Sequence, residues 1–191
     1  MAANTIELNR RRHNFEGVES IWLFGYGSLI YKVDFPFLEQ RPASIDGWVR
    51  RFWQGSHDHR GTPEAPGRVV TLIQKSGAVC KGMAYRVSPA VFEHLDHREK
   101  NGYLRLSVRL TFDDGSQSDG LVYIATEDNE AFLGAAADVD IARQIARAVG
   151  PSGPNSEYLF RLADSLRRLG DHCSHTFAIE SCLQSIGKND I

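Results

Sequence analysis

The order of the predicted elements is the feature that most constrains the fold of this chain. From about residue 20 to residue 126 the sequence consists mainly of short apolar or alternating segments typical of β-strands, and one helix interrupts them. The C-terminal third instead carries apolar residues at helical spacing. Because strands and helices do not alternate after residue 100, a doubly wound parallel sheet is not expected. The sequence predicts an α+β fold with a small mixed or barrel-like sheet and helices packed outside it.

The strand-rich region is punctuated by turn residues. The predicted strands cover residues 21–26, 44–52, 68–73, 79–87, 103–112 and 121–126. The last two are separated by Asp113-Asp114-Gly115, which is a strong signal for a tight turn. We expect Ser88 to cap the interrupting helix and Pro89 to occupy its first position.

Three helices are predicted in the C-terminal third. The first ends before Gly150, and its apolar face consists of Ile141, Ile145 and Val149. Asn155 is expected to cap the second helix and Gly170 to end it. The apolar face of that second helix consists of Leu159, Leu162, Leu166 and Leu169. A third, weaker helix is predicted over residues 172–186.

The composition is that of a globular domain. With 191 residues, 42% of them hydrophobic, the chain is long enough for one domain with a sizeable core. A net charge of −2 does not indicate a nucleic-acid-binding face, and no apolar run approaches the roughly 20 residues that a membrane span needs. We therefore expect neither a nucleic acid nor a membrane as a partner, and nothing in the sequence indicates an oligomeric state.

The N-terminal residues and the cysteines bear on domain organisation and location. Residues 1–19 are polar and lack the apolar stretch of a signal peptide, so we expect a flexible N-terminal extension followed by a single domain over residues 20–191. The three cysteines, Cys80, Cys173 and Cys182, are widely spaced and form no CxxC pair. They indicate neither a disulfide framework nor a zinc knuckle, and a reducing, cytoplasmic setting fits them best. Cys80 is expected to be a small core residue.

The run from Phe24 to Leu29, Phe-Gly-Tyr-Gly-Ser-Leu, is the most informative segment for function. Its two glycines allow a tight turn and a close approach by a ligand, and consecutive amide N–H groups in such a turn can bind an anion. A strand that ends in this loop is a plausible seat for a small acidic ligand. From this segment alone, an ordinary glycine turn after a strand is the favoured alternative.

A second cluster of polar residues follows the helix predicted after Ser88 and contains Glu99. A carboxylate at a helix C-terminus feels the negative end of the helix dipole, which disfavours its ionised form. Such a group can accept a proton and return it. The alternative is a solvated helix end at which Arg98 and Lys100 are compensating surface charges.

A polar loop rich in glycine and proline precedes Arg68. Its His57 and His59, with Asp58 between them, could suggest a metal site, but such a site usually needs a third and a fourth ligand at suitable spacing. His94 and His97 share a face of the predicted helix, but nothing fixes their relation to the loop, so a metal is not favoured. Arg68 can be interpreted as a bidentate partner for a ligand carboxylate or as part of a rim salt bridge.

Residues 150–154 form another glycine- and proline-rich loop, which leads into a predicted helix. Such a loop can bind an anion at the helix N-terminus, and Tyr158 in the first turn can direct its hydroxyl into a cleft. The alternative is a simple connection between helices. The sequence has no nucleophile elbow, no phosphate-binding P-loop and no serine or cysteine beside a recognisable base. An enzyme of this kind is expected to use a nucleophile that its substrate provides.

Taken together, these segments resemble the ChaC-type γ-glutamylcyclotransferases that act on glutathione. The resemblance extends over about residues 20–170, and its matching segments are residues 22–30, 32–36, 51–56, 58–61, 66–72, 98–100, 102–103, 150–153 and 157–159. Two positions depart from the family pattern. Asn101 stands where a glycine is common, and Glu64-Ala65 replaces a more basic, glycine-containing stretch.

The resemblance implies a γ-glutamylcyclotransferase fold and the cleavage of glutathione to 5-oxoproline and cysteinylglycine without a cofactor. It implies that Glu99 is the catalytic residue and that Arg68 and Tyr158 are candidates for orienting the ligand. The implied substrate-binding loop consists of Leu23, Phe24, Gly25, Tyr26, Gly27, Ser28 and Leu29. The alternatives are activity on other γ-glutamyl substrates and a non-catalytic binding or regulatory module with the same fold.

Overall fold

The computed structural model describes residues 4–189, and the chain divides into two compact units. The first unit contains the described part of residues 1–49 together with Gln74–Glu130. The second contains Arg50–Ile73 and the described part of residues 131–191. Two long strands, β2 (Glu39–Ser56) and β3 (Gly67–Val87), run through both units. The flexible extension of residues 1–19 and the single domain of residues 20–191 stay predictions, and residues 1–3 and 190–191 lie outside the described part of the chain.

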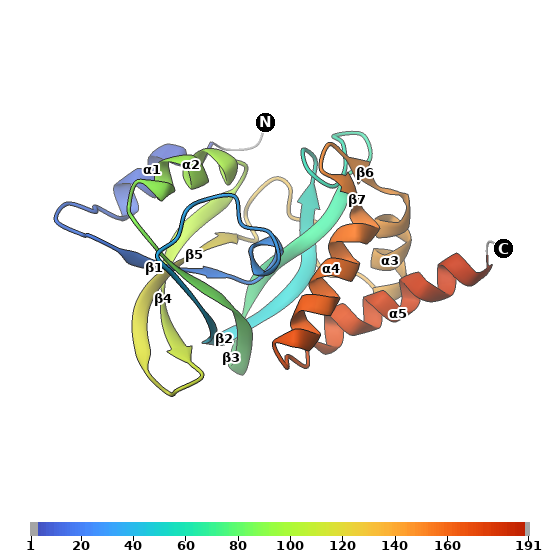
Figure 1. Ribbon diagram of the computed structural model, residues 1–191. Coiled ribbons are helices and arrows are strands. Elements are labelled where there is room, and N and C mark those ends of the chain that lie inside the picture. The colour runs from blue at the N-terminus through green and yellow to red at the C-terminus, as the bar shows by residue number, and fades with distance from the viewer. Residues whose placement is uncertain (1–3, 190–191) are drawn as a thin grey trace. The chain divides into compact units, whose positions relative to one another are not determined.

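The strands form a closed five-stranded barrel in the order β1-β3-β2-β4-β5 (Figure 1). The remaining barrel strands are β1 (Ile21–Gly25), β4 (Tyr103–Phe112) and β5 (Gln117–Ala125). Strand β1 pairs antiparallel with β3 and parallel with β5, whereas β4 and β5 form an antiparallel hairpin. This mixed barrel confirms the predicted α+β fold class.

A hydrophobic cluster fills the first unit between the barrel and helix α2 (Val91–Arg98). The predicted apolar face of this helix is confirmed, since its buried members are Val91, Phe92 and Leu95. The predicted cap is wrong, because the helix begins at Val91 and has no side-chain cap. Instead, the carbonyl groups of Ser88 and Pro89 accept hydrogen bonds from the N–H groups of Val91 and Phe92, so these two residues form a turn before the helix.

Two further elements of the first unit were not predicted. Helix α1 (Ile6–Arg12) lies in the expected N-terminal extension. A single 3₁₀ turn, η1 (Ser28–Ile30), follows the loop after β1. Both are short and lack an apolar face repeated over several turns, which is the signal that sequence periodicity detects.

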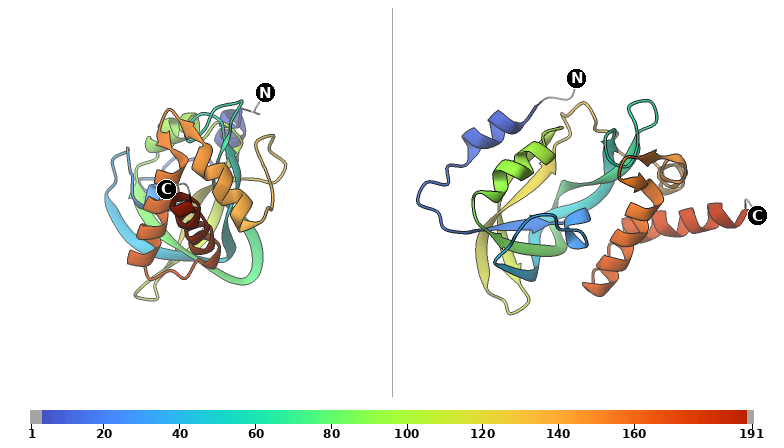
Figure 2. Two further views of the ribbon diagram at one scale, coloured as in Figure 1. Left: turned by 90° about the vertical axis from the view of Figure 1, so that its right-hand side faces the viewer. Right: turned by 45° about the horizontal axis from the view of Figure 1, so that its top comes forward.

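The second unit contains three helices that contact one another: α3 (Asp138–Arg147), α4 (Asn155–Arg168) and α5 (Ser174–Asn189) (Figure 2). The three predicted helices are therefore confirmed. The prediction that Val149 belongs to the first of them is wrong, because it lies on the two-residue strand β6 (Val149–Gly150), which pairs with β7 (Gly153–Pro154). Asn155 does not cap α4 from outside, because it is the first residue of the helix and its side chain bonds to the backbone of Arg68.

The predicted break between residues 73 and 79 is wrong, because β3 continues through it as one strand. Residues 74–77 are exposed, and Gly77 has a φ of 74°. A glycine with positive φ inside a strand is typical of a β-bulge, which bends a strand without ending it. The polar residues therefore mark a bend rather than a loop.

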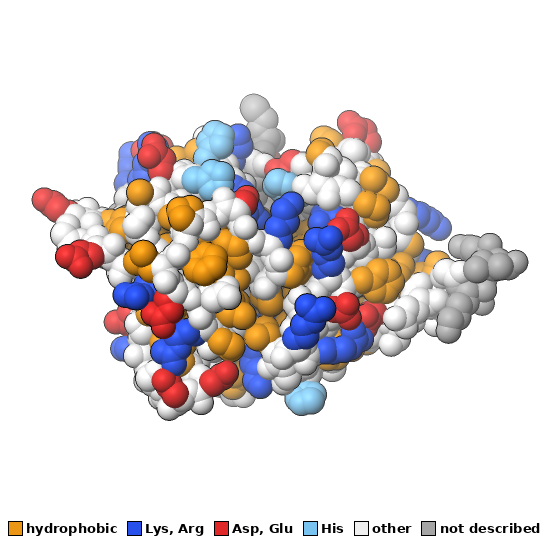
Figure 3. All heavy atoms as spheres, in the orientation of Figure 1, with side chains coloured by type: hydrophobic (Ala, Val, Ile, Leu, Met, Phe, Trp, Pro, Cys, Tyr) orange, Lys and Arg blue, Asp and Glu red, His pale blue; other side chains and the backbone are white. Residues whose placement is uncertain are grey.

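Several predictions about surface and core can be compared with the structure. Cys80 is buried, as expected, and all three cysteines are free. Positive and negative side chains are interspersed on the face drawn in Figure 3, in keeping with the small net charge. Within residues 4–189, no helix combines the length and the apolar character needed to cross a membrane.

Candidate functional site

The loop after β1 folds back closely on itself. A Cβ atom on Gly25 would lie 2.6 Å from the Cβ of Leu29, so this close approach requires glycine. The η1 turn is closed by hydrogen bonds from the N–H of Ile30 to the carbonyl of Gly27 and from the N–H of Tyr31 to the carbonyl of Ser28. The N–H groups of Gly27 and Ser28 precede this turn and are not used by it. Their contact with a ligand stays a prediction.

The large side chains of the predicted substrate-binding loop hold the loop in place. Leu23 and Phe24 are buried in the first unit, with exposed fractions of 0% and 1%. Tyr26 is buried and donates a 2.8 Å hydrogen bond from its hydroxyl to the carbonyl of Tyr123 on β5. Leu29 packs against the hydrophobic cluster and accepts a hydrogen bond at its carbonyl from the hydroxyl of Tyr85. Contact of these residues with a ligand stays a prediction, and only Gly27, Ser28 and Leu29 are partly exposed.

Glu99 lies at the C-terminal end of α2, where it caps the helix. Its N–H donates a 2.8 Å hydrogen bond to the carbonyl of Leu95, and its own carbonyl accepts a 3.3 Å hydrogen bond from the N–H of Tyr103. The side chain is 18% exposed. The backbone on both sides of Glu99 is thus fixed, while its side chain stays partly exposed.

One side chain, Arg98, joins Glu99 to the loop after β1. Its Nε lies 3.3 Å from Oε1 of Glu99, and its Nη2 lies 3.4 Å from Oγ of Ser28. Its Nη1 donates a 2.8 Å hydrogen bond to Asp34. A single guanidinium therefore brings together the predicted catalytic residue and the predicted binding loop. Sequence reasoning considered Arg98 only as a compensating surface charge, although its place beside Glu99 in the matching segment of residues 98–100 was a usable signal.

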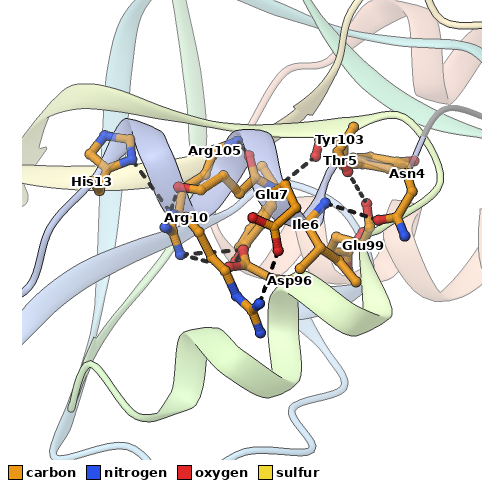
Figure 4. Close-up of polar contacts among 12 residues, drawn as sticks. Asn4, Thr5, Ile6, Glu7, Arg10, His13, Asp96, Glu99, Tyr103 and Arg105 are labelled. Atoms are coloured by element: carbon orange, nitrogen blue, oxygen red, sulfur yellow. Dashed lines mark hydrogen bonds and ion pairs between the residues drawn. The ribbon is translucent and has the colours of Figure 1, made fainter.

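A buried charge pair lies beside this site in the first unit (Figure 4). Nη1 of Arg105 is 3.2 Å from both carboxylate oxygens of Asp96, which belongs to α2. The hydroxyl of Tyr123 donates a 2.6 Å hydrogen bond to the same carboxylate. Burial, reinforced by Asp96, raises the pKa of Tyr123, so that its hydroxyl stays protonated and remains a donor. The pair therefore anchors helix α2, which ends next to Glu99, to the barrel.

The second unit holds the two other predicted site residues. Arg68 is buried and donates from Nε to Gln144 and from Nη1 to the carbonyls of Phe52 and Gly134, at 2.7, 3.0 and 2.9 Å. Burial lowers the pKa of Arg68. The hydroxyl of Tyr158 accepts a hydrogen bond from the N–H of Val70 at 3.3 Å. The structure thus brings Arg68 and Tyr158 into one packed region, and their contact with a ligand stays a prediction.

The remaining polar loops of the second unit pack against each other. The carbonyl of His59 accepts a hydrogen bond from the N–H of Ser152, and the Nδ1 of His59 lies 3.2 Å from the hydroxyl of Ser152. A Cβ on Gly150 would come within 2.4 Å of the His59 carbonyl oxygen. Over the described part of the chain, no three or more His, Cys, Asp or Glu side chains are grouped so as to hold a metal ion.

Comparisons with known proteins agree with this architecture. Residues 21–186 match the family model described as ChaC-like protein. The chain is 45% identical to "Gamma-glutamylcyclotransferase 2-3" of Arabidopsis thaliana, covering 82% of this chain and 84% of the relative. It is 43% identical to "Glutathione-specific gamma-glutamylcyclotransferase 1" of Danio rerio, covering 87% and 90%. A crystal structure of a γ-glutamyl cyclotransferase specific to glutathione from yeast superposes with a TM-score of 0.79 at 33% identity, covering 87% of this chain and 96% of that one.

Proposed function

Because the chain belongs to the ChaC-like protein family, we propose that it cleaves the γ-glutamyl bond of glutathione and releases 5-oxoproline and cysteinylglycine. The relative from Danio rerio is named as glutathione-specific, and the similar yeast structure is that of a γ-glutamyl cyclotransferase described as specific to glutathione. The observation in this chain that carries the proposal is the Arg98 guanidinium, which joins the Glu99 carboxylate to Ser28 of the loop after β1.

The reaction needs no nucleophile from the protein. The α-amine of the γ-glutamyl group attacks its own γ-carbonyl carbon, which forms the new C–N bond of a five-membered ring. The bond between that carbon and the cysteine nitrogen then breaks. The α-ammonium loses two protons as it becomes the lactam N–H, and the cysteine nitrogen gains two as it becomes the ammonium group of cysteinylglycine. Well-oriented intramolecular attack can reach effective molarities of about 10⁵–10⁸ M, so the main task of the protein is to fold the substrate back on itself.

Glu99 is the proposed proton carrier. Its carboxylate is partly exposed and has a fixed backbone, so it can accept the proton from the α-ammonium and return it to the leaving amine. General acid–base catalysis of this kind contributes typically about 10²–10⁴-fold. Arg98 keeps the carboxylate beside the loop, which orients it for both transfers.

The loop after β1 is proposed to hold the charged parts of the substrate. Main-chain N–H groups such as those of Gly27 and Ser28 can bind the α-carboxylate and stabilise the oxyanion that develops on the γ-carbonyl. The buried side chains of Leu23, Phe24 and Tyr26 keep these donors in position. Gly25 allows the close turn that presents them.

Arg68 and Tyr158 are proposed to help orient the ligand. Two observations support this role. Both residues lie in segments that match the family, and Arg68 carries a positive charge. In the second unit, as far as it is described, Arg68 donates to two carbonyls and one amide, and none of these acceptors is a carboxylate. Its charge is therefore not neutralised by a direct ion pair. A cytoplasmic location is also proposed, and the three free cysteines support it.

Activity on other γ-glutamyl substrates is the second candidate, because the relative from Arabidopsis thaliana is named as a γ-glutamylcyclotransferase without a stated substrate. The test is a comparison of kcat/KM for glutathione, γ-glutamylcysteine and γ-glutamylalanine with the purified chain. We expect glutathione to be preferred at least tenfold, which corresponds to about 1.4 kcal/mol of differential transition-state binding. Equal values for the three would favour the broader activity. No 5-oxoproline from any of them would favour a binding or regulatory module.

A further inference from the structure

The segment before and within α1 reaches the turn that carries Glu99, although it is remote from that turn in sequence (Figure 4). Residues 4–12 lie outside residues 21–186, which are the part matched by the family model. The segment is nonetheless partly buried, since Thr5 is 4% exposed and Asn9 is fully buried. Polar residues that are buried in this way are satisfied by specific hydrogen bonds, and their partners show what the segment holds.

Thr5 forms hydrogen bonds with the backbone directly after Glu99. Its N–H donates a 3.1 Å hydrogen bond to the carbonyl of Lys100, and its hydroxyl lies 3.1 Å from the same oxygen and 3.4 Å from the carbonyl oxygen of Glu99. A hydroxyl has one hydrogen, so Lys100 is its principal acceptor and Glu99 a weaker, shared one. The carbonyl of Lys100 can accept both bonds, because it has two lone pairs.

The neighbours of Thr5 make further contacts with the backbone beyond residue 100. Asn4 forms an isolated antiparallel bridge with Asn101. The side chain of Asn9 donates a 3.1 Å hydrogen bond to the carbonyl of Tyr103 and accepts a 2.8 Å hydrogen bond from the N–H of Arg105. Contacts from one short segment therefore follow the backbone from residue 99 to residue 105.

We propose that Thr5 is a positioning residue for Glu99, and this proposal rests on the proposed function. The N–H of Glu99 is bonded to a carbonyl of the helix, whereas the carbonyl of Glu99 is bonded to the N–H of Tyr103, which lies beyond the helix. The bonds from Thr5 therefore restrain the side of the turn that the helix itself does not fix. Restraining the backbone at residues 99 and 100 sets the direction of the Glu99 carboxylate. A displacement of about 1 Å in a catalytic group can reduce the rate by about 10²-fold, so this restraint has a measurable effect on turnover.

The test compares Thr5→Val with Thr5→Ser. Valine has nearly the same shape and keeps the main-chain bond, but it lacks the hydroxyl, whereas serine restores the hydroxyl. We expect Thr5→Val to reduce kcat for glutathione roughly tenfold with KM changed less than about twofold, and Thr5→Ser to recover most of the loss. Glu7→Ala is the matched control, because Glu7 lies on α1 and its contact among residues 4–189 is an exposed ion pair with Arg10.

Hydrogen exchange provides a readout that does not depend on activity. The N–H of Tyr103 should exchange faster in Thr5→Val than in the wild-type chain, while the Glu7→Ala control should leave it unchanged. A normal kcat in Thr5→Val, or a reduced kcat that Thr5→Ser does not restore, would overturn the positioning role. If the wild-type chain does not cleave glutathione, the proposed function fails. Faster exchange in Thr5→Val would then still support the restraint of the turn by Thr5, and unchanged exchange would overturn that as well.

Discussion

Two arginines, Arg98 in the first unit and Arg68 in the second, come from segments that match the same family, yet their surroundings differ. Arg98 is partly exposed and contacts two carboxylates, those of Asp34 and Glu99. Arg68 is buried and contacts an amide and two main-chain carbonyls. The first arrangement orients charged groups near solvent, and the second ties loops and strands together. We infer that substitutions near Arg98 act mainly on turnover and substitutions near Arg68 act mainly on stability.

The largest expected effect is that of Glu99→Gln, which tests the kinetic half of this comparison. Glutamine keeps the size of the side chain but cannot carry a proton, so kcat should fall by about 10²–10⁴-fold. The chain should still fold and bind glutathione, because the backbone bonds of Glu99 do not involve its carboxylate. Steady-state kinetics and glutathione titration calorimetry check both parts. Wild-type turnover by this variant would remove Glu99 from the mechanism.

The next effect concerns the stability of the second unit in acid. His175 accepts a hydrogen bond from the N–H of Phe52, and its pKa is lowered to about 4, first by burial and then by the nearby charge of Arg51, while Asp138 opposes the shift. Because the folded pKa is lower than the unfolded one, the unfolded chain binds the proton more readily. The stability from this group is fully present above about pH 6.5 and is lost as the pH falls toward 4, by about 2 kcal/mol after allowance for solvent screening.

Urea denaturation of the wild-type chain and of His175→Gln between pH 7 and pH 4 measures this contribution. Glutamine can still accept the bond from Phe52 but does not titrate, so the wild-type chain should lose about 2 kcal/mol of stability relative to the variant as the pH falls. A difference that stays constant over this range would contradict the assignment of acid sensitivity to His175.

An effect of similar size is expected from Arg68→Lys. Lysine keeps the charge but cannot reproduce the planar fork that serves Gln144, Phe52 and Gly134. Leaving buried acceptors without donors costs about 1–3 kcal/mol, so the free energy of unfolding should fall by that amount. If Arg68 also orients the ligand, KM for glutathione should rise. An unchanged KM in a destabilised variant would assign Arg68 to structure alone.

The smallest effect is expected from Arg98→Lys, which is the counterpart in the first unit. Lysine can still pair with Asp34 but cannot also join Ser28 to Glu99, so kcat should fall about tenfold. The stability should change by less than about 1 kcal/mol, because partly exposed ion pairs contribute little. Thermal unfolding and steady-state kinetics of this variant and of Arg68→Lys, measured together, would show whether the two arginines differ as proposed. Loss of stability without loss of turnover in Arg98→Lys would reverse the comparison.

The fold class and the regular elements could be predicted from periodicity and turn residues. The hairpin of β4 and β5, with its turn at Asp113-Asp114-Gly115, and the apolar face of α4 are repeated patterns that a sequence shows directly. The sequence predicts two strands where the structure has the single strand β3, because the exposed polar residues around Gly77 resemble a loop. Local composition does not distinguish a bend within a strand from a connection between strands.

At Glu99 and in the loop after β1 the candidate site is predicted by segments that carry the family resemblance, and the roles of these residues stay predictions. The roles of Arg98 and Thr5 could not be predicted, because each depends on contacts between parts of the chain that are far apart in sequence. Asn155 illustrates the same limit. Asparagine commonly caps helices, so the sequence predicts that Asn155 caps α4, but the side chain of Asn155 bonds to the backbone of Arg68 instead.

The most direct test of the central claim is to incubate the purified chain with reduced glutathione and to quantify 5-oxoproline and cysteinylglycine by mass spectrometry, with Glu99→Gln in parallel. The proposed mechanism predicts equal amounts of the two products from the wild-type chain and almost none from the variant. Formation of glutamate in place of 5-oxoproline, or equal product formation by both chains, would contradict intramolecular attack assisted by Glu99.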